Sequence, residues 1–220
     1  MGNIYYEPGC AFELYKPETS VRMMEYLKKH YPDIRRYDTC CRHEITIPKG
    51  STVIIVCSSC AMRLKEQDNT LDLKSLWSVI HENGDYPLPS YNGMKVSVHD
   101  SCTAKETPSI HHEVRTLLKD MDIDIIENKY NCMQSICCGD SLYGIVSDDK
   151  ALEAMRKRAG SMPCEKVVTY CISCMNAIYS GGRTPLLLTD LILGEETVPP
   201  VSRMSHDEWM SGQLEYIERH

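Results

Sequence analysis

Apolar and polar positions follow two different periods along the chain, and this predicts short strands separated by amphipathic helices. Strands are predicted at residues 4–6, 33–37, 51–56, 95–99, 123–126 and 166–170. Helices are predicted over residues 21–30, 71–80, 107–119, 148–159 and 186–193, with a shorter one ending near Leu64. Thr19 or Ser20 is the expected N-cap of the first helix. Strands that alternate with helices favour an α/β fold with parallel strands and right-handed crossovers.

The predicted elements occur twice in the same order, about ninety to one hundred residues apart. Each copy reads strand, Cys, helix, strand, Cys-Cys, strand, Cys-x-x-Cys, helix. We therefore expect two tandem, related Rossmann-like units with mostly parallel sheets and a pseudo-twofold relationship. The first unit would span residues 1–86 and the second residues 87–197. The tail, residues 198–220, carries Met210, Leu214 and Ile217 at helical spacing, which predicts an amphipathic helix that docks on this chain or on a partner.

The two copies differ in one spacer. Only 15 residues separate Cys41 from Cys57, whereas 32 separate Cys138 from Cys171. The helix predicted at residues 148–159 therefore has no counterpart in the first unit.

Charge and hydropathy exclude several classes of partner. The formal net charge is -7, which argues against a nucleic-acid-binding surface. No apolar run approaches the ~18 residues that a membrane span requires. The first residues lack the basic region and apolar core of a secretory signal, so a cytoplasmic location is expected.

Twelve cysteines are a high number for a protein expected in a reducing compartment, where metal ligation or redox chemistry is favoured over structural disulfides. They are arranged around Cys137-Cys138-Gly139, with Cys102 upstream and Cys171-Ile172-Ser173-Cys174 downstream. The single cysteines and the Cys-x-x-Cys pairs follow predicted strands, where ligands of α/β sheets gather. A shared metal centre, a zinc site, a thioredoxin-like thiol pair and simply buried thiols all fit parts of this pattern.

Gly139 and the Cys-x-x-Cys pairs have features that suit convergent thiolates. Adjacent cysteines share a site only when the backbone turns, and Gly139 permits a positive φ and a close backbone approach. Cys171 and Cys174 lie where a strand leads into a helix, whose N-terminal N–H groups favour thiolates.

Each half resembles the cysteine-rich CCG domain of heterodisulfide reductase B-like proteins, which also has relatives in iron–sulfur subunits of anaerobic glycerol-3-phosphate dehydrogenase and of lactate-utilisation systems. The resemblance covers roughly residues 4–194 and is carried by Tyr6-Glu7-Pro8-Gly9-Cys10, Cys137-Cys138-Gly139-Asp140 and Cys171-Ile172-Ser173-Cys174. The first half departs from it, because Cys41 is followed by Arg42-His43 instead of glycine.

The resemblance implies one or two non-cubane [4Fe-4S] clusters per chain, each held by five cysteines. The first set would be Cys10, Cys40, Cys41, Cys57 and Cys60, and the second set Cys102, Cys137, Cys138, Cys171 and Cys174. Gly9 and Gly139 would lie beside the cofactor. Catalytic roles are expected for Cys40, Cys41, Cys137 and Cys138, with His43 as a proton donor. For the first set, a smaller centre or an open group of thiols is also compatible with its departures.

Three residues stay outside these sets. His99 could donate a proton beside the second set or be an ordinary hydrogen-bonded histidine. Cys132 could be a further thiol near the second set or a loop residue, and Cys164 is expected to be structural.

The resemblance implies an enzyme that reduces a small disulfide with electrons from an iron–sulfur or flavin partner subunit. Two other functions fit the sequence: a non-catalytic electron-transfer subunit of an anaerobic dehydrogenase or quinone-linked complex, and a structural zinc or thiol protein. No nucleic-acid partner is expected, and a homo-oligomer is compatible with the sequence.

Overall fold

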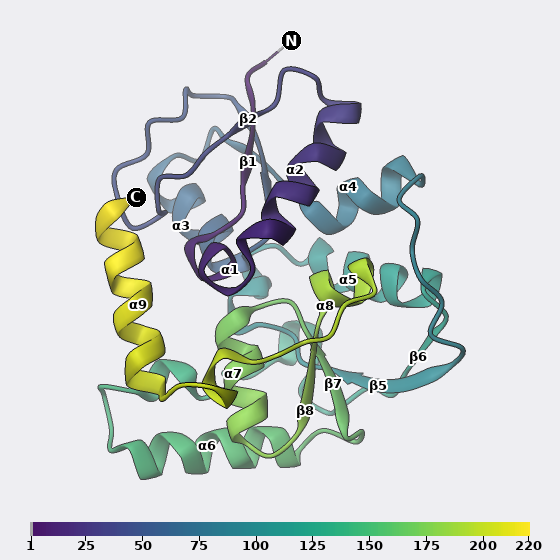
Figure 1. Ribbon diagram of the computed structural model, residues 1–220, viewed down its shortest axis with the longest axis vertical. Helices are drawn as coiled ribbons and strands as arrows, with labels where there is room; N and C mark the ends of the chain where they lie inside the picture. Colours follow the sequence, from purple (N-terminus) through teal and green to yellow (C-terminus); the bar gives the residue numbers. More distant parts are fainter. Residues whose placement is uncertain (1) are drawn as a thin grey trace.

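Two parallel sheets of four strands each form the framework of the chain (Figure 1). The structure, a computed structural model, describes residues 2–220. The predicted fold class is confirmed, because both units are α/β and all strand pairs within each sheet are parallel.

The first sheet has the strand order β2-β1-β3-β4. Its strands are β1 (Ile4–Glu7), β2 (Arg35–Arg36), β3 (Thr52–Ile55) and β4 (Asp72–Ser75). Its helices are α1 (Cys10–Tyr15), α2 (Pro17–His30), α3 (Ser58–Gln67) and α4 (Leu76–Asn83).

The second sheet repeats this arrangement with the order β6-β5-β7-β8. Its strands are β5 (Met94–Val98), β6 (Ile123–Ile125), β7 (Lys166–Thr169) and β8 (Thr184–Leu187). Its helices are α5 (Ser109–Asp120), α6 (Asp148–Gly160), α7 (Ile172–Ser180) and α8 (Leu188–Leu193). Four short 3₁₀ segments follow the loops: η1 (Cys102–Glu106), η2 (Cys132–Gln134), η3 (Asp140–Leu142) and η4 (Pro200–Ser202).

Two predicted helices, at corresponding places in the two units, were wrong in their first residues, which form strands. The segments predicted as helices at 71–80 and 186–193 begin as the edge strands β4 and β8, and the helix starts only at Leu76 and Leu188. Each strand continues into its helix without a loop. The apolar residues of the strand and the helix together therefore have a spacing that resembles that of a single helix. Pro185 is tolerated in β8 because an edge strand has an unpaired side.

The predicted N-cap of the first long helix was also wrong. Helix α2 begins at Pro17, whose fixed φ suits the first helical position. Thr19 and Ser20 lie inside the first turns and are buried.

One hydrophobic core runs through both units. It joins Tyr6, Leu27 and Leu76 of the first unit to Val98 and Leu117 of the second. Helices α4 and α5 pack against each other at this junction.

Polar contacts also join the units. The Nζ of Lys16 lies 2.7 Å from Oδ1 of buried Asp190, and the hydroxyl of Tyr15 donates a hydrogen bond to Oδ2 of the same residue at 2.8 Å. The two units are therefore held by both apolar and charged contacts.

The tail forms helix α9 (His206–Arg219), drawn in yellow in Figure 1, where it runs past α1. A capping box between Ser205 and Glu208 starts this helix. Trp209 and Ile217 are buried, whereas Leu214 is exposed. Of the two interpretations of the tail, the structure therefore shows docking on this chain.

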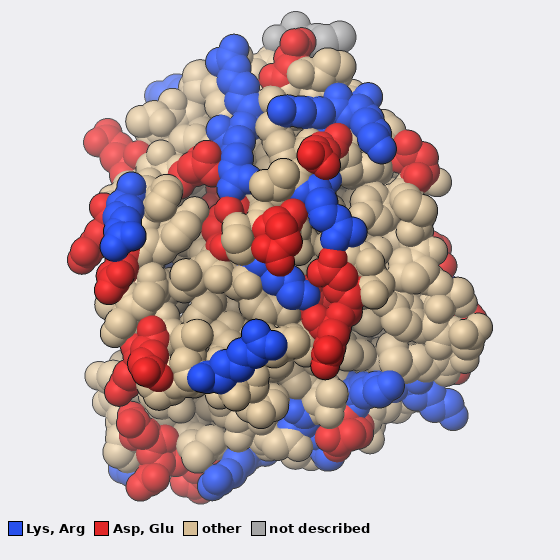
Figure 2. Space-filling view, viewed as in Figure 1, with Lys and Arg blue, Asp and Glu red and all other residues tan. Residues whose placement is uncertain are grey.

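The surface agrees with the modest negative charge. On the face shown in Figure 2, Lys and Arg side chains are interspersed with Asp and Glu. Within residues 2–220, no helix combines the length and the apolar character needed to cross a membrane.

Candidate metal and redox site

The cysteines of both sets lie beyond the carboxyl ends of strands. In the first unit Cys10 follows β1, the pair Cys40-Cys41 follows β2, and Cys57 follows β3. In the second unit the corresponding cysteines follow β5, β6 and β7. Parallel strands end at one edge of a sheet, so each fold brings distant parts of the chain to one place.

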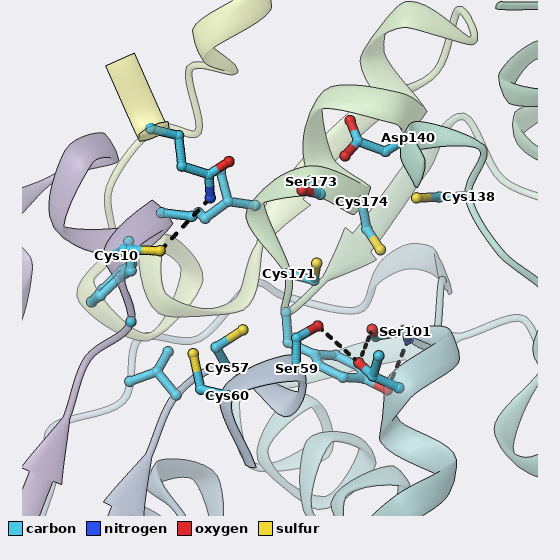
Figure 3. Close-up of a pocket in the computed structure, with 18 of the residues that line it drawn as sticks. Cys10, Cys57, Ser59, Cys60, Ser101, Cys138, Asp140, Cys171, Ser173 and Cys174 are labelled. Carbon is cyan, nitrogen blue, oxygen red and sulfur yellow. Dashed lines mark hydrogen bonds between the residues drawn. The ribbon is translucent and has the colours of Figure 1, made fainter. Parts of the chain in front are cut away.

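One cavity of about 380 Å³ lies between the two units and is lined by the cysteines of both. Figure 3 shows the sulfurs of Cys10, Cys57 and Cys60 on one side and those of Cys138, Cys171 and Cys174 on the other. The ten lining cysteines are Cys10, Cys40, Cys41, Cys57, Cys60, Cys102, Cys137, Cys138, Cys171 and Cys174. These are the ten cysteines assigned to the two sets from the sequence.

The thiols of the two sets contact one another in the same order. In the first set hydrogen bonds connect Cys10, Cys40, Cys41, Cys60 and Cys57 in that sequence. In the second set they connect Cys102, Cys137, Cys138, Cys174 and Cys171. The duplication therefore extends from the sheets to the individual sulfur atoms, although the second spacers differ in length.

One thiol in each set is strongly favoured as a thiolate. Hydrogen bonds from Cys10 and Cys41 lower the pKa of Cys40 to about 2. Its counterpart Cys137 has a pKa well below the usual range because Cys102 and Cys138 donate to it. A hydrogen bond from Cys60 lowers the pKa of Cys57 to about 6. Thiolates are the form that binds metal ions, so each set offers at least one thiolate to a soft metal, while the pKa of the thiols that donate to it, such as Cys10 and Cys102, is raised.

Gly139 has the positive φ that the sequence predicted, with a value of 104°. A Cβ at this position would lie 3.0 Å from Cγ and 3.1 Å from the backbone nitrogen of Met155 in α6. The backbone N–H of Gly139 donates to Sγ of Cys137 at 3.4 Å. Gly139 therefore permits both the turn after Cys138 and the close packing of α6 behind the second set.

A hydroxyl network forms part of the boundary between the two sets (Figure 3). The hydroxyls of Ser58 and Ser59 lie 2.7 and 3.2 Å from Oγ1 of Thr103, and Ser58 also donates to Ser101 at 3.2 Å. Ser58 and Ser59 lie in the Cys57–Cys60 segment, and Ser101 and Thr103 flank Cys102. The segment around Cys102, the first cysteine of the second set, is thus tied to helix α3, which carries Cys60 of the first set.

Asp100 holds the loop that carries Cys102. It forms an ion pair with Arg115 at 2.9 Å, accepts from Tyr170 at 3.1 Å and from the backbone N–H of Cys132 at 2.7 Å. Burial opposes the charge of Asp100, but the hydrogen bond and charge of Arg115 outweigh it and keep its pKa below the usual value.

Helix α9 packs against α1 and contacts the first set. Ile217 packs with Cys40, Cys41 and Cys60. The backbone N–H of Cys40 donates to the carbonyl of His220 at 3.1 Å, and Nε2 of Gln213 lies 3.8 Å from Sγ of Cys10. As predicted, the described part of the first unit has no counterpart of α6 between β2 and β3, and the C-terminal tail covers part of the first set.

The other end of α9 reaches the second set. His206 lies 3.2 Å from Oδ1 of Asp140 and stacks on Tyr143, with ring centroids 3.5 Å apart. All three side chains line the cavity.

His43, expected beside the first centre, lies outside the cavity lining. Its side chain is exposed and its Nε2 lies 2.6 Å from the carbonyl oxygen of Ile217. His43 thus fastens α9. Cys132 and Cys164 also lie outside the lining.

Sequence reasoning missed His206, Gln213 and Arg63 in the cavity lining. Arg63 stands three residues after Cys60 on α3 and could have been found from that spacing. His206 and Gln213 belong to the tail, and no local pattern connects the tail to the cysteines.

Two buried polar residues stand at matching places behind the thiols. Glu7 lies three residues before Cys10 and His99 three residues before Cys102. Burial raises the pKa of Glu7 to about 8 and lowers that of His99 to about 3. A nitrogen of His99 and the sulfurs of Cys138 and Cys174 all lie within 4.8 Å of one another.

Two Rossmann-like units with five thiols each around one cavity define a cysteine-rich α/β protein whose clustered thiols suit the binding of a metal or an iron–sulfur centre. Residues 96–179 match the family CCG, described as a cysteine-rich domain, which is typical of heterodisulfide reductase B-like proteins. The match spans all five cysteines of the second set. No curated protein matches the chain.

Proposed function

We propose that this protein reduces a small disulfide at two iron–sulfur centres, one held by each set of five cysteines. The observation that carries the proposal is the single cavity that both sets line, with the same order of thiol contacts in each. Four thiolates normally suffice for an iron–sulfur cluster. The resemblance to the CCG domain implies that a fifth serves an expanded, non-cubane [4Fe-4S] type. When bound, such clusters would supply one electron each.

The donor set of this chain fits that group. All ligands proposed are thiols, which select iron–sulfur clusters or zinc over hard cations. The described cysteines are all free, so none is removed from either set by a disulfide. The soft donor set alone does not separate iron from zinc, and metal analysis does so directly.

The cavity suits a small molecule. Its volume of about 380 Å³ falls in the usual range for small-ligand sites, ~300–1,000 Å³. A disulfide placed between the sets would have one sulfur facing each. Reduction takes two electrons and two protons and yields two thiols, so division between two centres releases no free sulfur radical.

Residues of this chain would supply the proton path and exclude water. His206 lines the cavity with its ring fixed by Asp140 and Tyr143, and we assign it the role of proton carrier. Helix α9 closes the cavity beside the first set. Electrons would come from a partner subunit that carries iron–sulfur clusters or flavin.

The test is anaerobic purification, followed by iron and acid-labile sulfide analysis and by assay of disulfide turnover with an artificial reductant. We expect iron and sulfide in the wild-type protein, and at least a hundredfold loss of turnover in Cys138→Ser. Cys164→Ser is the matched control, because this thiol lies outside the cavity, and it should retain both metal and turnover. A colourless protein loaded with zinc would refute the proposal. Iron and sulfide without turnover would favour the electron-transfer function.

A further inference from the structure

Comparison of the two units singles out His99. The residue three positions before the first cysteine is buried in both units, but it is Glu7 in the first and His99 in the second. The exposed fraction of His99 is 0%. Two thiols that contact each other and belong to the second set, Cys138 and Cys174, have their sulfurs within 4.8 Å of one of its ring nitrogens.

Arg158 determines which ring nitrogen carries the proton. The Nε of Arg158 donates a hydrogen bond to Nδ1 of His99 at 3.1 Å. A guanidinium only donates, so Nδ1 must accept and cannot carry a proton itself. The proton of the imidazole is therefore on Nε2, and Nε2 is buried without a hydrogen-bond partner among the described residues.

Arg158 is itself held firmly in this position. It is 2% exposed and its other nitrogens donate to Oδ1 of Asn128 at 3.3 Å and to the carbonyl oxygen of Tyr130 at 2.9 Å. Arg158 belongs to α6, which has no counterpart in the first unit. The first unit therefore lacks both the imidazole and the residue that orients it.

The same geometry argues against His99 as a metal ligand. A neutral imidazole that binds a metal through Nε2 has its proton on Nδ1, and that nitrogen usually donates to a carboxylate or carbonyl. In this chain Nδ1 faces the N–H of Arg158, so a proton there would point at another proton. An N–H donor role for Nε2 leaves no such conflict.

We propose that Nε2–H of His99 donates a hydrogen bond to a sulfur atom of the centre held by the second set and raises the reduction potential of that centre. This inference rests on the proposed function, since it needs an iron–sulfur centre at the second set. A donor that withdraws electron density from sulfur stabilises the reduced, more negative form of a cluster. His99 would contact the second centre directly, and Arg158 is the residue that positions it.

The first test needs no variant and no cofactor. Nitrogen-15 NMR of the metal-free protein reports the tautomer of His99 through the shifts of its two ring nitrogens. We expect protonation at Nε2 alone. A proton on Nδ1 would overturn the inference.

The second test is a redox titration of the loaded protein monitored by EPR. His99→Leu should shift the potential of one centre to a more negative value and leave the other unchanged, whereas His99→Gln, which keeps an N–H donor near the position of Nε2, should retain most of the wild-type value. His111→Leu is the matched control, because His111 is also buried with an unpartnered Nε2 among the described residues but does not belong to the group that His99 forms with Cys138 and Cys174.

The outcomes separate this inference from the proposed function. Unchanged potentials in His99→Leu, with both centres present, would overturn the donor role alone. A strong hyperfine coupling from labelled histidine, typical of nitrogen bonded to iron, would overturn it in favour of direct ligation. A protein without iron or sulfide would overturn the proposed function, and the inference with it.

Discussion

Buried residues of this chain can be charged because a specific partner compensates them, as Asp190 shows. Its carboxylate is fully buried and is held by Lys16 and Tyr15. Burial raises the pKa of Asp190, and the contacts from Lys16 and Tyr15 act in the opposite direction.

Lys16→Met should therefore destabilise the protein by about 3 kcal/mol at neutral pH, because the buried carboxylate loses its charged partner. Without Lys16 the pKa of Asp190 rises further. The folded state then takes up a proton as the pH falls through that raised pKa, while the unfolded state remains ionised until about 3.8. The difference in free energy of unfolding between the wild type and Lys16→Met should therefore become smaller as the pH falls from the raised pKa of Asp190 toward about 3.8.

Urea unfolding at several pH values measures this effect. Lys29→Met, at an exposed position on α2, is the control and should change the free energy of unfolding by less than about 0.5 kcal/mol. A loss of unfolding free energy in Lys16→Met that is the same at every pH would contradict the role given to the Asp190 carboxylate.

Gly139 also acts at the scale of a single residue. Gly139→Ala places a methyl group against Met155 and forces an L-residue into φ of 104°. Gly144→Ala is the matched control, because its φ is also positive, 75°, but no atom lies within 4 Å of a Cβ built there.

We expect about 1 kcal/mol of destabilisation from Gly144→Ala, due to backbone strain alone. Gly139→Ala should lose a further ~1–3 kcal/mol from overpacking and should bind less metal at the second set. Thermal unfolding and metal analysis check both variants. Equal losses in the two would mean that the contact with Met155 has no energetic role.

At the scale of elements, the first and second sets are walled differently. Helix α6 packs behind the second set through Met155, whereas Ile217 of α9 packs on the first. The two walls come from unrelated positions in the chain and still leave the same order of thiol contacts.

Ile217→Ala should destabilise the protein by about 3 kcal/mol, since it removes a buried side chain from the cluster with Cys40, Cys41 and Cys60. It should also lower the metal content of the first set and leave the second set loaded. Leu214→Ala is the control, because Leu214 lies on the same helix and is 47% exposed. Metal content and the free energy of unfolding, measured on both variants, test this prediction. Equal loss of metal from both sets would contradict the idea that Ile217 shields the first set only.

Elements were predictable from the sequence where the local pattern was unambiguous. The run at residues 51–56 became β3, and the amphipathic segment after Pro108 became α5. The strands β4 and β8 were missed because each continues directly into a helix. The alternation of apolar and polar residues typical of a strand is therefore not seen separately from the helical spacing. The docking of α9 depends on contacts between residues such as His206 and Asp140, which local periodicity does not encode.

At the scale of the whole molecule, the duplication was visible because cysteines are rare and their spacing repeats. The family resemblance implied which cysteines would share each set, and all ten of them line the cavity. It did not predict that both sets would face one cavity, because this depends on how the units pack through α4, α5 and the shared core. The role of Arg158 was hidden for the same reason: its contact with His99 joins residues 59 positions apart.

The wall supplied by α9 has a consequence for biosynthesis. Ile217 follows Cys60 by 157 positions, so at ~5–20 residues per second a ribosome reaches it roughly eight to thirty seconds after the last thiol of the first set. During that interval the nascent first unit has its five cysteines but no cover over them. If the first set holds the proposed centre, its thiols are open to incoming metal until the final helix folds onto Cys40 and Cys41.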